Sequence, residues 1–518
     1  MKSRTIRVAL GLMLSLGLLA PASAMAVEIE PQSLGGPELT AAQKLVLREY
    51  ARDTWASFKA MTFNTTGLTA DNMNEAGRRA RYTSPTNIAT YLWAVLAARD
   101  LKFITADEAR QRINVTLTSL NQMERGRAGM YYNWYNPQTR EKLTVWPVNG
   151  DTVYPFLSSV DNGWLTAALM MVSNAVPELA VKADRIANRM NYGFYYDQNA
   201  GLLRGGYWPE PPPGQGGGTG GPNNETGYTG HHYGSLNTEP RIASYIGIAR
   251  GQIPATHYFK LWRTFPSNCD WSWQEMKPEG VTRTYLGVDV YEGHYTYRGM
   301  DIVPSWGGSM FEALMVPLVV PEEVWGARSW RVNHPLYVRA QIVHGMREAQ
   351  YGYWGFSPSN DPAGGYREYG VDAIGLNPDG YSSDHERTTV DYGFEGCRPP
   401  GNTSPDWGQG TVTPHASFLA LRWRPDSAMG NLSRLRQNFN AYNGNYGFYD
   451  AINVSTGQKS RYFLALDQGM IMTSIHNALT DDLARRYLST DVVRTDGTLF
   501  RDVIAPLLGR ETFTAGFN

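Results

Sequence analysis

The 518-residue sequence is poor in charged residues and in cysteine. Charged side chains make up 18% of the chain, and 47 basic residues against 48 acidic ones leave a net charge of −1. Nucleic-acid binding needs clustered lysine and arginine, so this near-neutral balance argues against a nucleic-acid partner. The two cysteines, Cys269 and Cys397, either pair in an oxidising compartment or stay separate thiols, and neither lies in a catalytic-cysteine context.

Several motifs of metal and nucleotide chemistry are also missing. The chain has no P-loop, no G-x-S-x-G nucleophile elbow and no EF-hand spacing. His231 and His232 are adjacent, but no second cluster such as H-E-x-x-H stands at ligand spacing. We therefore reject a metal site at these histidines.

Long apolar runs are absent after the first 26 residues, and no later stretch approaches the ~20 apolar residues that span a bilayer. Residues 1–24 combine three basic residues, the short apolar core VALGLMLSLGLLA and the small-residue site Ala22-Ser23-Ala24. This pattern is typical of a secretory signal peptide cleaved after residue 24, or after residue 26. We expect a secreted or periplasmic monomer without a membrane partner.

Aromatic residues are abundant, with 15 Trp, 31 Tyr and 17 Phe. Flat apolar faces with polar edges suit the C–H face and the hydroxyls of a sugar ring, although most such rings pack in a core. Many of these residues stand in Gly- and Asn-rich loops such as GMYYNWYNP and YGYWGFSPSNDPAGGY. The composition therefore indicates a glycan-binding protein.

Apolar residues recur at helical spacing along most of the chain, with little strand-like alternation. We predict helices at 38–60, 84–101, 105–123, 161–177, 180–191, 239–250, 309–317, 334–349, 415–422, 429–441 and 467–488. The Pro/Gly tract at 209–222 and the polar stretch 376–412 interrupt this series as long loops. We predict a single all-α domain over residues 25–518, a toroid of helix pairs whose aromatic loops meet at one end.

Seven segments in chain order resemble a known family. They are 83–105 (TSPTNIATYLWAVLAARDLKFIT), 129–139 (GMYYNWYNPQT), 158–169 (SSVDNGWLTAAL), 234–254 (GSLNTEPRIASYIGIARGQIP), 304–317 (PSWGGSMFEALMVP), 354–366 (WGFSPSNDPAGGY) and 464–472 (LALDQGMIM). They look like the glucoamylase-like family, which includes the endo-β-1,2-glucanases of glycoside hydrolase family 144 and the middle domain of cyclic β-1,2-glucan synthases. The resemblance implies an (α/α)6 toroid, a glycan cleft, an oligo- or polysaccharide substrate and no required cofactor.

Glu239 is the first candidate for catalysis. A glutamate in the first helical turn stabilises the helix dipole by roughly 0.3–1 kcal/mol, which is a sufficient structural role. Pro240, however, already suits the first helical position. A carboxyl at the mouth of an aromatic loop is partly desolvated, which raises its pKa as a general acid requires. The resemblance places the matching glutamate in the catalytic cleft, so we favour catalysis.

Glycoside hydrolysis needs a second carboxylate across the scissile bond. The resemblance places Asp467, in LALDQG, near the cleft, and its structural alternative is a helix cap. Glu312, in GGSMFEAL, matches a glutamate of the cyclic-glucan-synthase-like members. Asp161 is either a helix N-cap or a sugar-binding carboxylate. We rank Asp467 and Glu312 together, with Asp161 behind them.

Further candidates for substrate binding come from the aromatic loops and from residues near Glu239. They are Tyr131, Trp134, His232, Tyr233, Arg241, Trp306 and Trp354. The loop with Tyr131 and Trp134 is either a stacking platform or part of a hairpin core. Arg241 either orients Glu239, pairs with a neighbouring acid or forms a surface salt bridge.

Two other functions compete with a glycoside hydrolase. A polysaccharide lyase would use His232, Tyr233 and Arg241 as its base and its neutralising group. A non-catalytic glycan-binding protein would keep the same scaffold. The second alternative is suggested by residues 158–162 and 474–479, which depart from the β-1,2-glucanase pattern and alter two cleft-facing acids and an arginine.

Overall fold

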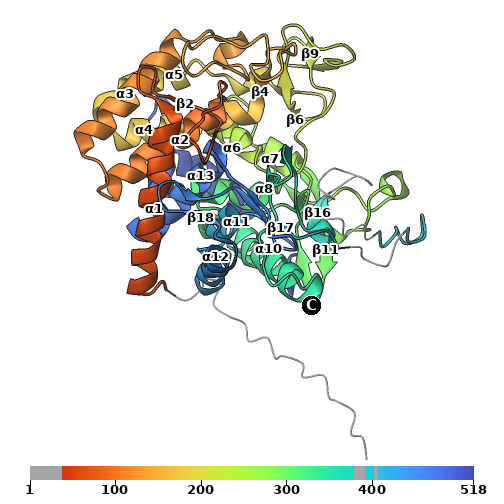
Figure 1. The fold of residues 1–518 in the computed structure, drawn as a ribbon. Helices are drawn as coiled ribbons and strands as arrows, with labels where there is room; N and C mark the ends of the chain where they lie inside the picture. The colour runs from red at the N-terminus through yellow and green to blue at the C-terminus, as the bar shows by residue number, and fades with distance from the viewer. Residues whose placement is uncertain (1–37, 377–390, 402–406, 518) are drawn as a thin grey trace, which may run out of the picture. The chain divides into compact units, whose positions relative to one another are not determined.

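The computed structural model describes residues 38–376, 391–401 and 407–517, which all lie in the unit Leu34–Asn518. Helices dominate this part of the chain, and six of them are buried on nearly every side (Figure 1). These inner helices are α2 (Pro85–Asp100), α4 (Ser159–Ala175), α6 (Arg241–Ala249), α8 (Met310–Leu314), α11 (Pro414–Leu419) and α13 (Ala465–Thr480).

The inner helices pack against one another in a fixed order. Helix α2 contacts α4 and α13, α4 contacts α6, and α11 contacts both α13 and α8. Every residue of α6 and of α11 is buried, as is every residue of α2 from Pro85 to Ala98. Helices without a polar face belong in the interior of a large protein, so these six form the core.

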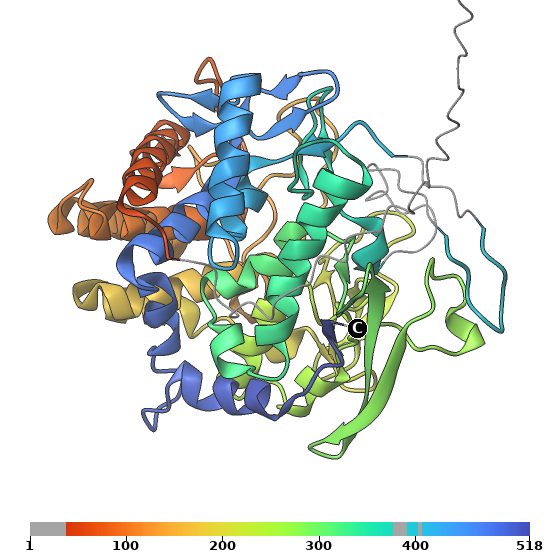
Figure 2. The ribbon, with the colours of Figure 1, turned by 90° about the horizontal axis from the view of Figure 1, so that it is seen from below.

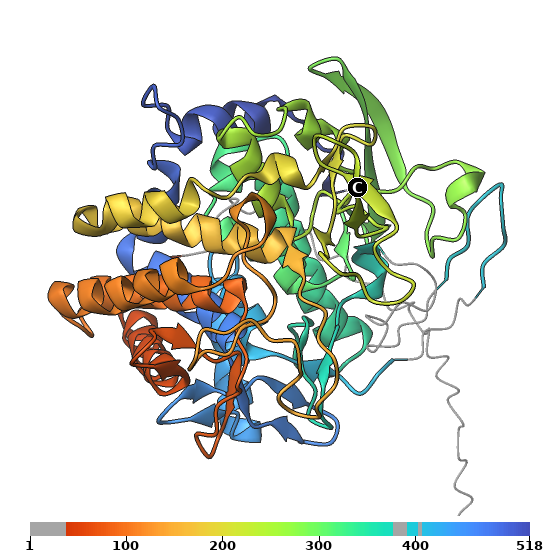
Figure 3. The same cartoon turned by 90° about the horizontal axis from the view of Figure 1, so that it is seen from above.

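A second set of helices lies outside the first and buries one face only. Helix α1 (Ala41–Met61) packs on α2 and α13, and α3 (Ala106–Gln122) packs on α2. Helix α5 (Ala180–Ala187) covers α4, and α12 (Pro425–Phe439) covers α11. Figures 2 and 3 show these outer helices from below and from above. The remaining longer helices are α10 (Trp330–Val343), α14 (Leu483–Ser489) and α15 (Phe500–Arg510).

Two helix starts follow from capping residues in the sequence, whereas α10 and α12 begin four residues before the predicted starts at 334 and 429, and the predicted helix 467–488 is divided into α13 and α14. The Ser84 side chain accepts a hydrogen bond from the Asn87 amide at the start of α2. The Thr105 side chain accepts one from the Glu108 amide at the start of α3, while the Glu108 carboxylate pairs with Arg112. Helix α15 was missed.

The prediction of a helix-rich chain is confirmed, but the all-α description is incomplete because the loops form small sheets. The longest strands are β10 (Glu279–Tyr285) and β11 (Val288–Tyr297), an antiparallel hairpin that projects beside the helices in Figure 2. With β12 (Met300–Ile302) and β23 (Gly516–Phe517) they form a four-stranded sheet. Strand β10 is exposed on both faces, so its sequence shows no alternation by which it could be recognised.

The two long loops predicted from the sequence differ in how much of each the structure describes. The 209–222 tract lies among short strands, since β8 (Gly218–Gly220) pairs with β9 (Glu225–Tyr228). Part of the 376–412 stretch, and the predicted signal peptide, lie outside the described residues. Among the helices that the structure describes, none is long and apolar enough to cross a bilayer.

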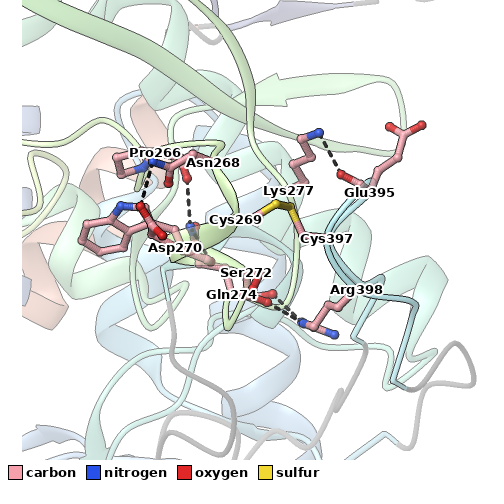
Figure 4. The surroundings of a disulfide bond; sticks show 11 residues. Pro266, Asn268, Cys269, Asp270, Ser272, Gln274, Lys277, Glu395, Cys397 and Arg398 are labelled. Atoms are coloured by element: carbon pink, nitrogen blue, oxygen red, sulfur yellow. Dashed lines mark hydrogen bonds between the residues drawn. A yellow bond between two sulfur atoms is a disulfide. The ribbon is translucent and has the colours of Figure 1, made fainter.

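The two cysteines form a disulfide, which resolves the alternative left open by the sequence. Cys269 and Cys397 are joined across 128 residues with a Cα–Cα separation of 5.4 Å (Figure 4). Beside it, the Arg398 guanidinium donates to the carbonyl oxygens of Ser272 and Gln274, both at 2.5 Å. The bond therefore ties the segment before β10 to the segment 391–401.

Replacing both cysteines by serine is expected to lower the free energy of unfolding by about 2–4 kcal/mol, because the cross-link restricts the unfolded chain. Chemical denaturation of the double variant measures this loss. Reduction of the unmodified protein should produce the same shift, and reduction of the double variant should produce none. Equal stability of the oxidised protein and the double variant would contradict the expectation.

Candidate active site

The inner helices bring their N-terminal ends together, and carboxyl groups gather there. The Thr86 hydroxyl of α2 donates to Asp161 Oδ1 of α4 at 2.6 Å. One turn further along α4, the Trp164 indole N–H donates to Glu239 Oε2 at 2.6 Å. The Glu239 amide in turn donates to Glu312 Oε2 of α8 at 2.9 Å. Three predicted acids therefore lie side by side although 151 residues separate the first from the last.

Glu239 lies directly before α6 and is partly buried. Its carbonyl oxygen accepts a hydrogen bond from the Ile242 amide, while its side chain turns to Trp164. Burial raises the pKa of the Glu239 carboxyl well above its usual value, and the nearby Glu312 carboxylate raises it further. Both effects favour the protonated form of Glu239, which is the form that a general acid needs.

Glu312 stands in the first turn of α8, after the N-cap Ser309. Burial raises the pKa of Glu312 to about 7, although hydrogen bonds from the Glu239 amide and the Thr238 hydroxyl oppose the shift. Two neighbouring carboxyls with raised pKa values can share one negative charge between them. One can then carry a proton while the other is ionised.

Glu239 and Glu312 face the same cavity, which has a volume of about 180 Å³. Two further residues of this cavity, Glu368 and Tyr366, were not singled out from the sequence. Trp306, a predicted binding residue, also lines it. The complete lining is Glu239, Trp306, Gly307, Ser309, Phe311, Glu312, Pro358, Tyr366, Glu368, Tyr369 and Leu466.

Tyr366 interacts electrostatically both with Glu239 and with a further acid, Asp467. It lies on β15 (Tyr366–Arg367), which pairs with β14 (Ser359–Asn360). Its surface is 52% exposed, yet desolvation and the charges of surrounding acids raise the pKa of its hydroxyl well above the usual value. Those acids are Asp467, Asp450, Glu239 and Glu368. The Tyr366 hydroxyl therefore lies in the electrostatic field of all four acids, although much of the residue is exposed.

Asp467 lies on the other side of Tyr366, in the first turn of α13, and it does not cap that helix. No donor among the described residues satisfies either carboxyl oxygen of Asp467, while Asp450 lies within hydrogen-bonding contact. Burial raises the pKa of Asp467 to about 7, and the pKa of Asp450 is raised well above its usual value. A protonated Asp450 that donates a hydrogen bond to the Asp467 carboxylate gives each of these two buried carboxyl groups a partner.

His415 of α11 flanks this pair without carrying charge. Its Nδ1 lies 3.4 Å from Asp467 Oδ2. Burial lowers the pKa of His415 to about 4, so the imidazole is neutral and hydrogen-bonds to Thr413 and Ser357.

Asp161 lies within the acidic group, and Ser158 rather than Asp161 caps α4. The Asp161 carboxylate accepts hydrogen bonds from Thr86 at 2.6 Å and from the Asn133 side-chain amide at 3.0 Å. Its negative charge contributes to the raised pKa of Glu239. A sugar hydroxyl at Asp161 would therefore lie beside the predicted acid.

The prediction that Arg241 binds substrate is wrong. Its guanidinium is fully buried and forms a two-point ion pair with Glu322, at 2.7 and 2.9 Å. The remaining donors bond to the carbonyl oxygens of Thr238, Glu312 and Ala313. Arg241 therefore holds the backbone beside both candidate acids without facing the cavity.

Most of the predicted aromatic platform is core. Tyr131 is 1% exposed, and its hydroxyl donates to the Leu120 carbonyl oxygen at 2.8 Å. Trp354 is equally buried, so neither ring can stack on a sugar. Trp134 alone is partly exposed, packed against Tyr82 and Trp146.

His232 and Tyr233 lie on the loop before Glu239 and outside the cavity lining. His232 Nε2 lies 2.9 Å from Asp197, which also pairs with Arg204. The lyase alternative therefore loses two of its proposed groups, since His232 is held by Asp197 and Arg241 is buried. No group of three potential metal ligands occurs within the described residues.

The shared burial of these acids predicts that the folded protein loses stability as the pH rises. Glu312 and Asp467 have folded-state pKa values of about 7, against ~4 in an unfolded chain. Their contribution to the free energy of unfolding is complete below pH ~4 and is lost as the pH rises through 7. The free energy of unfolding then falls by at most ~1.4 kcal/mol per pH unit for each group. Denaturation between pH 4 and 8 measures the slope. Glu312→Gln and Asp467→Asn should each flatten it, and an unchanged slope in both would contradict this assignment.

Comparisons with known proteins agree with the predicted family. A family model described as "Putative glucoamylase" matches residues 276–490, and one described as "Protein of unknown function" matches residues 49–200. The resemblance to the glucoamylase-like family is thus confirmed.

Two curated relatives carry β-1,2-glucan in their names. The chain is 23% identical over 609 residues to the cyclic beta-(1,2)-glucan synthase of Rhizobium meliloti, an alignment that covers 89% of this chain and 18% of the relative. It is 27% identical over 127 residues to an exo beta-1,2-glucooligosaccharide sophorohydrolase of Parabacteroides distasonis, with 24% of this chain and 16% of the relative covered. The chain therefore spans less than a fifth of the length of these relatives.

A solved structure shows the fold. The endo-beta-1,2-glucanase from Chitinophaga pinensis, in complex with sophorotriose and glucose, superposes with a TM-score of 0.58 at 16% identity. The superposition covers 87% of this chain and 96% of that one. The chain thus has a fold of the glucanase type.

Proposed function

We propose that this protein is an exported glycoside hydrolase that cleaves a β-1,2-glucan or a related β-glucan by carboxylate acid/base chemistry. The observation that carries the proposal is that Glu239 and Glu312 line one cavity with carboxyls of raised pKa, joined by the hydrogen bond from the Glu239 amide to the Glu312 carboxylate. Two curated relatives and the superposed glucanase, each named for β-1,2-glucan, support the choice of substrate.

In the proposed reaction, Glu239 donates its proton to the glycosidic oxygen, directly or through a substrate hydroxyl. Glu312 or Asp467 activates the attacking water or attacks the anomeric carbon. Glu312 lines the cavity, whereas Asp467 is 1% exposed behind Tyr366. Of the two, Glu312 is therefore the one already in position to act in this cavity.

The proposed scaffold is an (α/α)6 toroid in one domain, with its aromatic loops at one end. The sequence in which the inner helices contact one another supports this scaffold. In chain order, α2, α4, α6, α8, α11 and α13 follow one another around the core, and α13 contacts α2 again. Export through the predicted signal peptide is supported by the disulfide, since such bonds persist in oxidising compartments. We propose a monomer without a nucleic-acid or membrane partner.

A reducing-end assay of the mature protein tests the proposal. The panel contains linear and cyclic β-1,2-glucan, β-1,3-glucan, α-glucans and an arabinan. We expect new reducing ends from β-1,2-glucan. Folded protein that binds this glycan but releases no reducing ends would favour a non-catalytic binding protein, and unsaturated products would favour a lyase.

A further inference from the structure

A second cavity, of about 460 Å³, lies against the first. Tyr369 lines both cavities, so the two are neighbours on either side of this side chain. The described lining of the second is Asp361, Pro362, Ala363, Arg367, Tyr369, Trp407, Gly408, Gln409, Thr411, Asn453 and Gln458.

The wall between the cavities is the extended segment 366–369. Successive side chains of an extended chain point to opposite faces. Tyr366 and Glu368 accordingly line the cavity of Glu239, while Arg367 lines the second. A chain molecule bound across this segment would therefore have one part beside the candidate acid and another part in the second cavity.

The sizes of the two cavities favour a ligand that occupies both. Ligand pockets commonly measure 300–1,000 Å³. The cavity of Glu239 is smaller than this range, so it holds a part of a glycan, whereas the second falls within it.

The second cavity combines one aromatic ring with amides and a charged pair. The partly buried Trp407 ring packs edge-on against His344 at 5.2 Å, and its loop is fixed by a 2.9 Å hydrogen bond from the Tyr351 hydroxyl to the Gly408 carbonyl oxygen. A ring held in this way offers a flat apolar face to a sugar without ordering a mobile side chain.

The polar lining suits hydroxyl groups. The Asn453 amide donates to Gln409 Oε1 at 2.8 Å, and the Gln409 and Gln458 side chains are exposed at the rim. Arg367 lies 3.8 Å from Asp361. Amides and a paired charge supply both the donors and the acceptors that sugar hydroxyls require. They provide no excess of positive charge, which a polyanionic ligand would need.

We propose that the second cavity binds sugar units of the same neutral glycan beyond the scissile bond, with Trp407 as the stacking residue and Gln458 as a hydrogen-bonding residue. This inference rests on the proposed function. It predicts that the protein prefers long chains over short ones, because a short oligosaccharide occupies the cavity of Glu239 without reaching Trp407.

The test compares a β-1,2-linked trisaccharide with a long linear β-1,2-glucan. In Trp407→Ala, kcat/KM for the long chain should fall roughly five- to tenfold more than for the trisaccharide, mainly through KM. Gln458→Ala, an exposed residue whose loss threatens folding less, should change the ratio in the same direction. Trp273→Ala is the matched control, because Trp273 is 40% exposed and lines neither cavity.

Binding of the long glucan to Glu239→Gln, with and without Trp407→Ala, separates this inference from the proposed function. Weaker binding in the double variant supports the second cavity even if the unmodified protein cleaves nothing. Equal losses for both chain lengths, or unchanged binding in the double variant, would overturn the inference while leaving the hydrolase proposal to the reducing-end assay.

Discussion

Replacing Glu239 by glutamine is expected to lower turnover by ~10²–10⁴-fold while the protein stays folded. Glutamine keeps the size of the side chain and an oxygen for the Trp164 indole N–H. It has no proton to give to the leaving oxygen, so the loss should appear in kcat. Steady-state kinetics on the glucan that the panel identifies measure it, and circular dichroism and the unfolding midpoint report on the fold.

The same substitution should remove one limb of the pH profile. The raised pKa of Glu239 favours its protonated form, so activity should fall as the pH rises through that pKa. In Glu239→Gln the residual activity should no longer fall on the alkaline side. A leaving group that needs no protonation should restore much of the lost rate.

Glu124→Gln is the matched control for this experiment. Glu124 is 58% exposed and pairs with Lys142 at 2.7 Å, so its loss removes a carboxylate without touching the site. Its kcat should equal that of the unmodified protein. A Glu239→Gln rate within a few-fold of the Glu124→Gln rate would refute the assignment of Glu239 as the acid.

The acids of the site were selected from the sequence through the family resemblance. Asp161, Glu312 and Asp467 each stand in the first turn of an inner helix, and Glu239 lies just before another. The helix dipole and the unpaired amides of a first turn stabilise carboxylates, so this local pattern explains an acid at each position without marking it as catalytic. The resemblance supplied the catalytic assignment.

Tyr366, Glu368 and Asp450 were missed for the opposite reason. Tyr366 and Glu368 lie on or next to the short strand β15, and Asp450 lies in a bend before residue 451, so none of them belongs to a periodic pattern. A single sequence gives no measure of long-range packing. The nearest signal was the YGYWGFSPSNDPAGGY loop, whose last residue is Tyr366.

The wrong assignments came from side chains whose polar groups can serve either in substrate binding or in hydrogen bonds inside the core. Arg241 and Tyr131 have the polar groups of binding residues, but both satisfy them inside the core, on Glu322 and on the Leu120 carbonyl oxygen. Burial depends on what the rest of the chain supplies, and neither Glu322 nor Leu120 is marked as a partner by its spacing. The sequence alone therefore gave residue types without their partners.

Glu322→Ala is expected to cost about 3–5 kcal/mol of stability, because it leaves the buried guanidinium of Arg241 without its counter-charge. Burial opposes ionisation of Glu322, but Arg241 and His334 outweigh it and hold its pKa at about 2. The Tyr245 hydroxyl and His334 also bond to the same carboxylate. Denaturant unfolding measures the loss, which should be several times that of Asp107→Ala, the removal of an exposed partner of Arg110.

Activity should fall in the same variant although Glu322 does not touch the cavity. Arg241 binds the carbonyl oxygens of Thr238 and Glu312, and an unpaired guanidinium would move from these positions. The double variant Glu322→Leu, Arg241→Met removes both charges, so it should recover much of the lost stability. It should not recover the activity, because the backbone beside Glu239 and Glu312 loses its donors. Equal recovery of both would show that the ion pair serves stability alone.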